Sequence, residues 1–157
     1  MLNITPEEDK ELRKLLTELA TESKSKIAIL IDKSGQLISR NDSPSFSSDD
    51  ITFASLTAGN VAASEALSKL LGDKNLNHMF TETEEEGIYM ILMDEKYILV
   101  VIFNKDRSNL GIARVKIKRL YPAIRNLLKR IEERTENETS ISANINVEEV
   151  DLDSLFE

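Results

Sequence analysis

Two neighbouring segments of this chain are apolar at every position, and they constrain its fold more than any other feature. Residues 88–93 (IYMILM) and 97–103 (YILVVIF) are separated only by Asp94-Glu95-Lys96, which has the length and polarity of a hairpin turn. Hairpin strands are antiparallel, and an antiparallel sheet with one wet face shows alternating polar and apolar residues. Because these two strands do not alternate, we expect helices to cover both faces of the sheet.

Three further segments complete the predicted sheet. Residues 26–32 (KIAILID) and 36–40 (QLISR) form a hairpin whose turn contains Gly35, a residue free to adopt a positive φ. Residues 78–84 are a polar strand of the kind found at a sheet edge. Residues 85–87 and 94–96 are the predicted turns between the last three strands.

Apolar residues at helical spacing predict three helices, over residues 6–23, 48–71 and 110–135. Thr5 and Glu8 form a capping box at the start of the first helix, and Pro122 should bend the last one. The last helix should face inward with Ala113, Ile117, Leu120, Ile124, Leu127, Leu128 and Ile131. The predicted fold is therefore of the α/β (α+β) class, a five-stranded antiparallel sheet with helices on both faces in the order α-ββ-α-βββ-α.

The middle helix has two neighbouring stripes of different character. One contains Phe53, Leu56, Ala63, Leu67 and Leu70, which we expect to pack on the sheet. The other contains only small residues: Ser55, Gly59, Ala62 and Ala66. A glycine in an exposed helix costs about 1 kcal/mol relative to alanine, and small side chains let another backbone come close. We interpret this stripe as a partner-binding surface, with solvent or a tight internal contact as the alternative.

The C-terminal residues differ in composition from the rest. Residues 136–157 hold seven acids and no Lys or Arg, whereas the preceding residues hold 21 acids and 20 bases. Residues 136–146 show no period, which predicts a flexible linker after a domain of residues 1–135. Residues 147–157 form an acidic-apolar segment that we expect to be disordered in the free protein and to order on a partner. The residues expected to dock are Val147, Val150, Leu152, Leu155 and Phe156; the alternative is an acidic tail without a role.

Composition and missing motifs argue against several classes of function. The chain has no cysteine and one histidine, His78, so thiolate and His-rich metal sites and cysteine nucleophiles are excluded. Neither phosphate-binding glycine motif is present, no nucleophile–base pair is visible, and we expect no cofactor, no metal and no enzyme activity. A nearly neutral body argues against nucleic acid. No apolar run reaches the ~18 residues of a membrane span, and the N-terminus lacks a signal core, so we expect a cytoplasmic protein without a membrane partner.

Several segments together resemble one family. The run SLTAGNVAA (residues 55–63) is similar to the middle helix of the Roadblock/dynein light chain family, in particular to its bacterial polarity regulators. The similarity extends over IDKSGQLIS (31–39), YILVVIF (97–103), SNLGIARVKIKR (108–119) and the DLDSLF ending (151–156).

The resemblance implies a function in cell polarity and motility. Such proteins form homodimers in which the middle helices lie side by side and the third strands join the two sheets. The dimer presents its middle helices to a small Ras-like GTPase (MglA-like), repositions the catalytic groups of that GTPase without supplying an arginine, and so accelerates GTP hydrolysis. The C-terminal segment can dock on the GTPase and affect nucleotide exchange. A non-catalytic Roadblock scaffold protein and, less favoured, a PAS-like sensory module are the alternatives.

Overall fold

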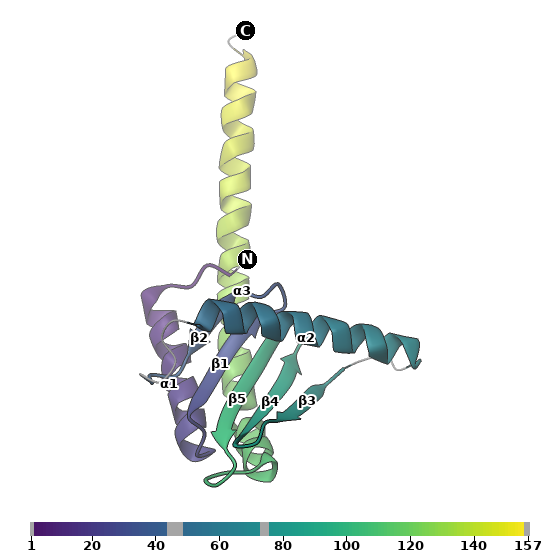
Figure 1. The fold of residues 1–157 in the computed structure, drawn as a ribbon. Helices are drawn as coiled ribbons and strands as arrows, with labels where there is room; N and C mark the ends of the chain where they lie inside the picture. Colours follow the sequence, from purple (N-terminus) through teal and green to yellow (C-terminus); the bar gives the residue numbers. More distant parts are fainter. Residues whose placement is uncertain (1, 44–48, 73–75, 156–157) are drawn as a thin grey trace.

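The computed structural model describes residues 2–43, 49–72 and 76–155, with side chains described as far as residue 144. Its elements follow the predicted order (Figure 1). They are α1 (Pro6–Glu22), β1 (Ile27–Asp32), β2 (Leu37–Arg40), α2 (Asp50–Leu70), β3 (His78–Glu82), β4 (Glu86–Met93), β5 (Tyr97–Asn104) and α3 (Leu110–Leu155).

The five strands form one antiparallel sheet in the order β2-β1-β5-β4-β3. The most apolar strand, β5, lies at the centre, and β3 lies at an edge as its polarity predicted. Every residue of β5 from Tyr97 to Phe103 is buried. The turn predicted at residues 85–87 was misplaced, because Glu86 and Gly87 already belong to β4 and pair with Asn104 and Phe103.

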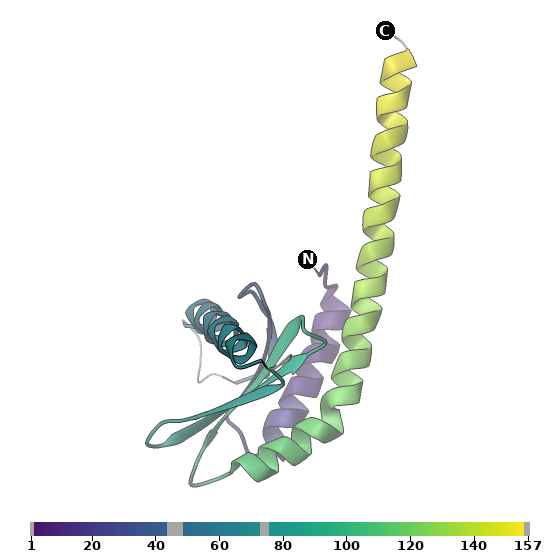
Figure 2. The ribbon, with the colours of Figure 1, turned by 90° about the vertical axis from the view of Figure 1, so that its right-hand side faces the viewer.

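Helices cover both faces of the sheet, as the two apolar strands required (Figure 2). On one face Leu99 and Val101 of β5 pack with α1 and α3; on the other, Ile98 and Val100 pack beneath α2. The predicted inward residues of α3 are all buried in the first of these cores. The fold class predicted from the sequence is confirmed.

Ion pairs fasten α1 to α3 along their length. Arg119 pairs with Glu18 and Glu22, and Arg130 pairs with Glu11 at 3.1 Å. At the N-terminal end of α1, Thr5 and Glu8 form the predicted capping box, in which each side chain accepts from the backbone N–H of the other.

The last helix is longer than predicted. We expected it to end at residue 135, before a flexible linker at 136–146 and a disordered segment at 147–157, but α3 continues to Leu155. That expectation about the backbone was wrong because it treated missing periodicity as a helix end. No Gly or Pro lies between Pro122 and Leu155, so nothing in the sequence stops propagation of the helix. The domain boundary at 135 itself stays a prediction.

Two features of α3 are visible in Figure 2. The helix changes direction within its green part, in agreement with the bend that Pro122, the proline inside this helix, was predicted to cause. Farther along, the helix leaves the body and projects from it alone.

The Glu8 carboxyl also binds α3, which makes helix docking depend on pH. The Arg134 guanidinium, which approaches Glu8 to 2.6 Å, holds the pKa of that carboxyl below its ordinary value, and the Thr5 N–H acts in the same direction. A carboxyl with a lowered folded pKa contributes stability above its unfolded pKa, about 4.3, and loses it as pH falls through the folded value.

Glu8→Gln keeps an acceptor for the Thr5 N–H but removes the charge that Arg134 binds, so it should lower the free energy of unfolding by about 1 kcal/mol at pH 7. Urea denaturation should show the gap between parent and variant closing as pH falls below about 4.3. Glu7→Gln, at an exposed position of the same turn, should have a much smaller effect. A gap for Glu8→Gln that is unchanged at pH 3 would contradict this assignment.

Candidate partner-binding surface

Helix α2 rests on the sheet through small side chains. Its buried residues are Ala54, Thr57, Ala58 and Val61. The β1–β2 turn also approaches the helix closely, since a Cβ built on Gly35 would lie 3.3 Å from the Cα of Ser55. Gly35 has a φ of +98°, the positive value that the sequence predicted for this turn. Small residues therefore bring α2 close to the strands beneath it.

The leucines of α2 face away from the sheet, contrary to our prediction. Leu56, Leu67 and Leu70 are 69%, 61% and 84% exposed, and Ala63 is also exposed. Of the five residues predicted to pack on the sheet, Phe53 does so, as a partly buried side chain. The prediction was wrong because it gave the core the largest apolar side chains, whereas a helix this close to a sheet accepts only small ones.

The predicted small-residue stripe is exposed as well. Ser55, Gly59, Ala62 and Ala66 all lie on the solvent side of α2. At 100° per residue this stripe lies directly beside the leucines, so the two together cover about half of the helix. We call these residues, with Ile51, Leu56, Leu67 and Leu70, the α2 surface. A Cβ on Gly59 would meet nothing within 4 Å, so no contact with the described part of the chain accounts for this glycine.

The C-terminal half of α2 extends beyond the sheet (Figure 1). No residue of α2 after Val61 is buried. Leu70 and the following Leu71, 81% exposed, lie at this free end. Contiguous exposed apolar residues of this kind are rare on monomers and mark surfaces that another molecule covers.

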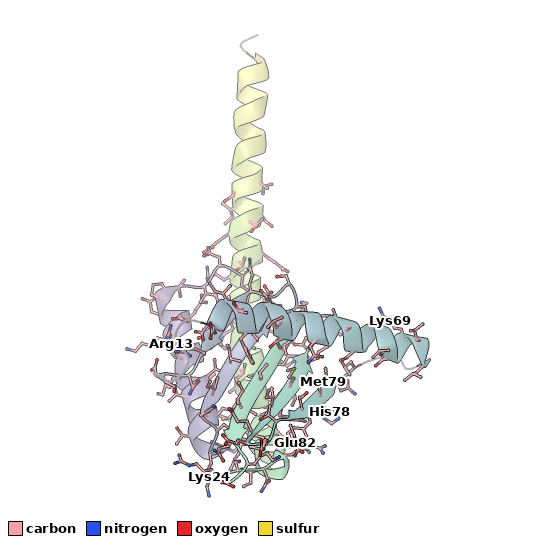
Figure 3. The ribbon with its side chains drawn as sticks, in the orientation of Figure 1. Arg13, Lys24, Lys69, His78, Met79 and Glu82 are labelled. Atoms are coloured by element: carbon pink, nitrogen blue, oxygen red, sulfur yellow. The ribbon has the colours of Figure 1, made fainter. Side chains whose placement is uncertain are left out.

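The edge strand β3 lies below this free end of α2. Figure 3 shows His78 and Met79 on β3 under the helix end that includes Lys69. Among the described strands, β3 pairs only with β4, so its other backbone edge is available for pairing. The Nδ1 of His78 lies 2.9 Å from the Tyr89 hydroxyl, whose pKa is raised by burial. This contact gives His78 a structural partner within its own sheet.

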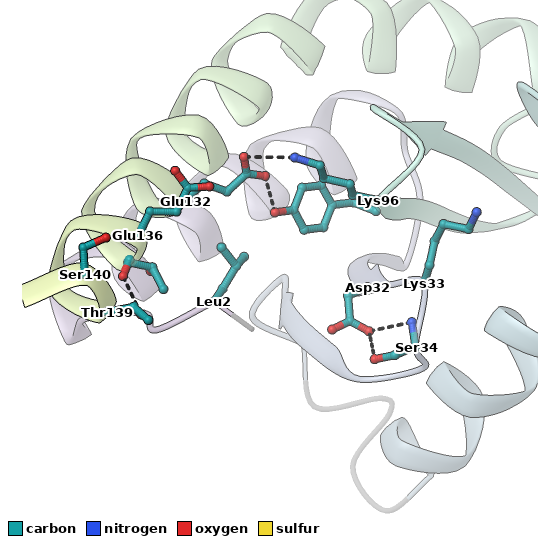
Figure 4. Close-up of a pocket in the computed structure, with 11 residues that line it drawn as sticks. Leu2, Asp32, Lys33, Ser34, Lys96, Glu132, Glu136, Thr139 and Ser140 are labelled. Atoms are coloured by element: carbon teal, nitrogen blue, oxygen red, sulfur yellow. Dashed lines mark hydrogen bonds and ion pairs between the residues drawn. The ribbon is translucent and has the colours of Figure 1, made fainter. Parts of the chain in front are cut away.

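A cavity of about 710 Å³ lies between the β1–β2 turn, the β4–β5 turn and α3 (Figure 4). Inside it the Tyr97 hydroxyl donates to Glu132, which Lys96 also approaches to 3.4 Å. Burial, together with the bond to Glu132, raises the pKa of Tyr97 well above its ordinary value. Asp32 accepts from the backbone and hydroxyl of Ser34.

Two of the charged groups of this cavity, Lys96 and Glu132, pair with each other, and Asp32 holds the β1–β2 turn. Lys33 points instead to α2, where it pairs with Glu65 at 2.8 Å. Among the described residues, no three acidic or histidine side chains are placed to hold a metal. No helix in the described part of the chain is both long and apolar enough to cross a membrane.

The residues predicted for tail docking lie far from the α2 surface. Val147, Val150, Leu152 and Leu155 fall in the projecting part of α3, while Phe156 lies outside the described residues. The structure thus places the two predicted binding segments on different elements. Sequence reasoning missed the exposed leucines of α2, although their number in one helix was a visible signal.

Comparison with known proteins agrees with this geometry. The family model of the Roadblock/LC7 domain matches residues 11–103. The structure of Myxococcus xanthus MglB is 33% identical, with 76% of this chain and 96% of that chain covered and a TM-score of 0.70. The gliding protein MglB of Thermus thermophilus is 28% identical, with coverages of 84% and 96% and a TM-score of 0.72.

A third similar structure is described as MglB with a tetrameric arrangement. It is 27% identical, with coverages of 84% and 96% and a TM-score of 0.74. Among curated protein sequences, none matches this chain.

Truncating Val61 and Leu70 to alanine tests which face of α2 supports the fold. Val61→Ala should lower the free energy of unfolding by roughly 2 kcal/mol, because it opens a cavity in the core under α2. Leu70→Ala removes a larger side chain, yet it should change the free energy of unfolding by less than about 0.5 kcal/mol, because Leu70 is exposed. The measurement is urea denaturation at a protein concentration low enough to exclude self-association. The reverse order of effects would show that α2 is rotated from the position described.

Proposed function

Because this chain belongs to the Roadblock/LC7 domain family, we propose that it is a GTPase-activating regulator of a small Ras-like bacterial GTPase and that it acts as a homodimer. The observation that supports the proposal best is the α2 surface, an exposed apolar half-helix with an open glycine at its centre. The similarity to MglB structures points to the same class of regulator. The proposal implies a cytoplasmic location, where such GTPases meet GTP.

Dimer formation would use the features at one edge of the molecule. The free edge of β3 can pair with β3 of a second copy, which joins the two sheets. The overhanging end of α2, with Leu67, Leu70 and Leu71, would then pass over the second sheet and be covered. A stable interface of this kind buries about 1,200–2,000 Å² in total.

The small residues of α2 would meet the GTPase. Ser55, Gly59, Ala62 and Ala66 allow a partner backbone to approach the helix axis, and they contribute shape but no charge. An arginine supplied to a GTPase in trans accelerates hydrolysis by about 10³–10⁵-fold. The only base in α2 is Lys69, at its free end. We therefore infer that the regulator acts by repositioning the catalytic groups of the GTPase itself.

The C-terminal segment would add a second contact. Val147, Val150, Leu152, Leu155 and Phe156 are apolar residues among acids, which suits a partner surface that is both apolar and basic. Docking there would strengthen GTPase binding or change nucleotide exchange.

A non-catalytic Roadblock scaffold is the second candidate, since the same two surfaces could hold a complex together without affecting hydrolysis. A measurement of GTP turnover separates the two. A PAS-like module is not favoured, because in the cavity of Figure 4 Glu132, Lys96 and Tyr97 bind one another and so are not free to hold a ligand.

Light scattering at micromolar concentration should give twice the 17.7 kDa mass of the chain. Leu67→Glu combined with Leu70→Glu should shift the mass toward the monomer, since each buried carboxylate would lose its water without gaining a partner. The same pair of substitutions at exposed Ser142 and Asn144 should leave the mass unchanged. A parent protein seen only at 17.7 kDa would exclude the homodimer.

Replacing Ala62 and Ala66 with arginine should abolish the acceleration of GTP hydrolysis by a Ras-like GTPase from the source genome. Both positions are exposed, so the variant should stay folded, but arginine would add bulk and charge where the GTPase must approach. Ala123→Arg, at an exposed alanine of α3, is the matched control and should keep full activity. Circular dichroism and light scattering check folding and dimerisation. Hydrolysis at the parent rate with the double variant would show that this surface is the wrong one.

A further inference from the structure

The side of α2 that rests on the sheet begins and ends with an acidic side chain. Six residues follow one another along this side at helical spacing: Asp50, Ala54, Thr57, Ala58, Val61 and Glu65. The middle four are the buried residues of the helix, and the two acids are partly buried. Acids are rarely buried unless they are paired, so each of the two needs an explanation.

Both acids form ion pairs with the β1–β2 hairpin. The Lys33 ammonium lies 2.8 Å and 3.1 Å from the two carboxylate oxygens of Glu65. At the other end the Arg40 guanidinium lies 3.4 Å from the Asp50 carboxylate, and these two side chains are only 15% and 18% exposed. The two acids are about 22 Å apart along the helix, at about 1.5 Å per residue. In the described part of the chain, one hairpin thus holds α2 at both ends of its contact with the sheet.

The pair of Glu65 cannot be explained by the helix alone. An acid in the first turn is favourable by itself, because the helix dipole attracts it, so Asp50 has a local explanation. Glu65 lies in the last third of the 21-residue helix, and Lys69, four residues later, is in the position of a local partner. The carboxylate nevertheless pairs with Lys33, 32 residues away in the sequence. The contact with the hairpin therefore accounts for an acid on this side of α2.

The turn that carries Lys33 is itself held in place. Asp32 accepts hydrogen bonds from the Ser34 hydroxyl at 2.6 Å and from the backbone N–H groups of Ser34 and Gln36 (Figure 4). The backbone N–H of Lys33 donates to the Lys96 carbonyl at 3.0 Å. Because its backbone is fixed on both sides, Lys33 can fix the position of the helix residue that it binds.

The position of Glu65 matters because the apolar contact of α2 is short. The buried residues lie within residues 54–61, about 10 Å of helix, and all but Val61 are small. The helix continues to Leu70, about 18 Å from Ala58, so a tilt of about 10° at Ala58 would displace Leu70 by about 3 Å. A displacement of 1 Å can already lower a catalysed rate by about 10²-fold. Glu65 is attached farther out than the buried contact and so restrains this tilt.

We propose that Lys33 and Glu65 are positioning residues for GTPase activation, because their ion pair sets the angle at which α2 presents the α2 surface to the Ras-like GTPase. This inference rests on the proposed function and adds two residues that lie outside the α2 surface. Breaking the pair leaves every residue of that surface in place but changes its direction. The geometry requires opposite charges at the two positions and not a particular residue at either.

Charge reversal at each position, alone and together, tests the assignment. Lys33→Glu or Glu65→Lys brings like charges together and should lower the maximal rate of GTP hydrolysis at saturating regulator by about tenfold or more, equivalent to about 1.4 kcal/mol. The variant with both changes restores an ion pair and should return to within about threefold of the parent. Urea denaturation and light scattering check that each variant is folded and has the parent mass, so that lower stability alone does not affect the rate.

The matched control reverses an exposed ion pair between α1 and α3. Arg130→Glu and Glu11→Arg, alone and together, should keep the parent rate. Glu65→Gln keeps the size of the side chain without introducing repulsion, should lose about threefold or more, and replaces the charge reversals if these unfold. Parent-like rates for the folded variants of Lys33 and Glu65 would overturn the positioning role. A loss that the doubly reversed variant does not recover would overturn it as well.

A distance within the free protein provides a test that needs no GTPase. The chain has no cysteine, so spin labels can be attached at Lys69→Cys on α2 and Lys129→Cys on α3, both exposed positions. Dilution into excess unlabelled protein restricts pulsed electron paramagnetic resonance to the distance within one chain. Glu65→Lys should broaden the distance distribution or shift it by about 3 Å or more, and the added Lys33→Glu should restore it.

An unchanged distribution in the folded Glu65→Lys variant would overturn the inference, even if the rate of hydrolysis falls. If the parent accelerates hydrolysis by no Ras-like GTPase of the source genome, the proposed function fails. The distance distribution then still decides whether this ion pair sets the direction of α2.

Discussion

The central strand β5 is buried on both faces, and the rest of the structure depends on that burial. Its side chains alternate between two cores: Leu99 and Val101 contact α1 and α3, while Ile98 and Val100 lie under α2. Neither helix layer could be removed without exposing a row of aliphatic side chains to water, at about 25 cal/mol for each Å². The strand therefore requires cover on both sides of the sheet.

The two layers meet this requirement unequally. On one face, α1 and α3 bury long aliphatic residues and are joined by ion pairs such as Arg130–Glu11. On the other face, α2 buries only small side chains plus Val61 and leaves its leucines in solvent. This second layer resembles half of an interface, since the leucine surface and the free edge of β3 lie at the same border of the molecule. The same asymmetry gives the chain both a stable body and a surface suited to partners.

A second asymmetry lies within α3, where one helix has two environments. Its N-terminal part completes the core, and its C-terminal part projects from the body. The body thus sets the direction in which this C-terminal part leaves it.

Local sequence patterns were sufficient to predict the type and order of the strands and helices, although not the start of β4 or the end of α3. The capping box at Thr5 and Glu8, the positive φ of Gly35 and the edge position of β3 all follow from residues close in the chain or from polarity, and the structure confirms them. The exposure of the stripe that includes Gly59 agrees with its interpretation as a surface, while its partner stays a prediction.

Two features were decided only by the tertiary structure. Periodicity shows that α2 has two kinds of stripe, but the closeness of the sheet decides that Ala54 and Ala58, and not Leu67 or Leu70, are buried. Composition indicates that residues 136–155 cannot form a core of their own. Their attachment to a helix that the body already holds decides that they are helical. In both cases the local sequence allows more than one arrangement. The neighbouring elements decide which face of α2 is buried and how far α3 extends.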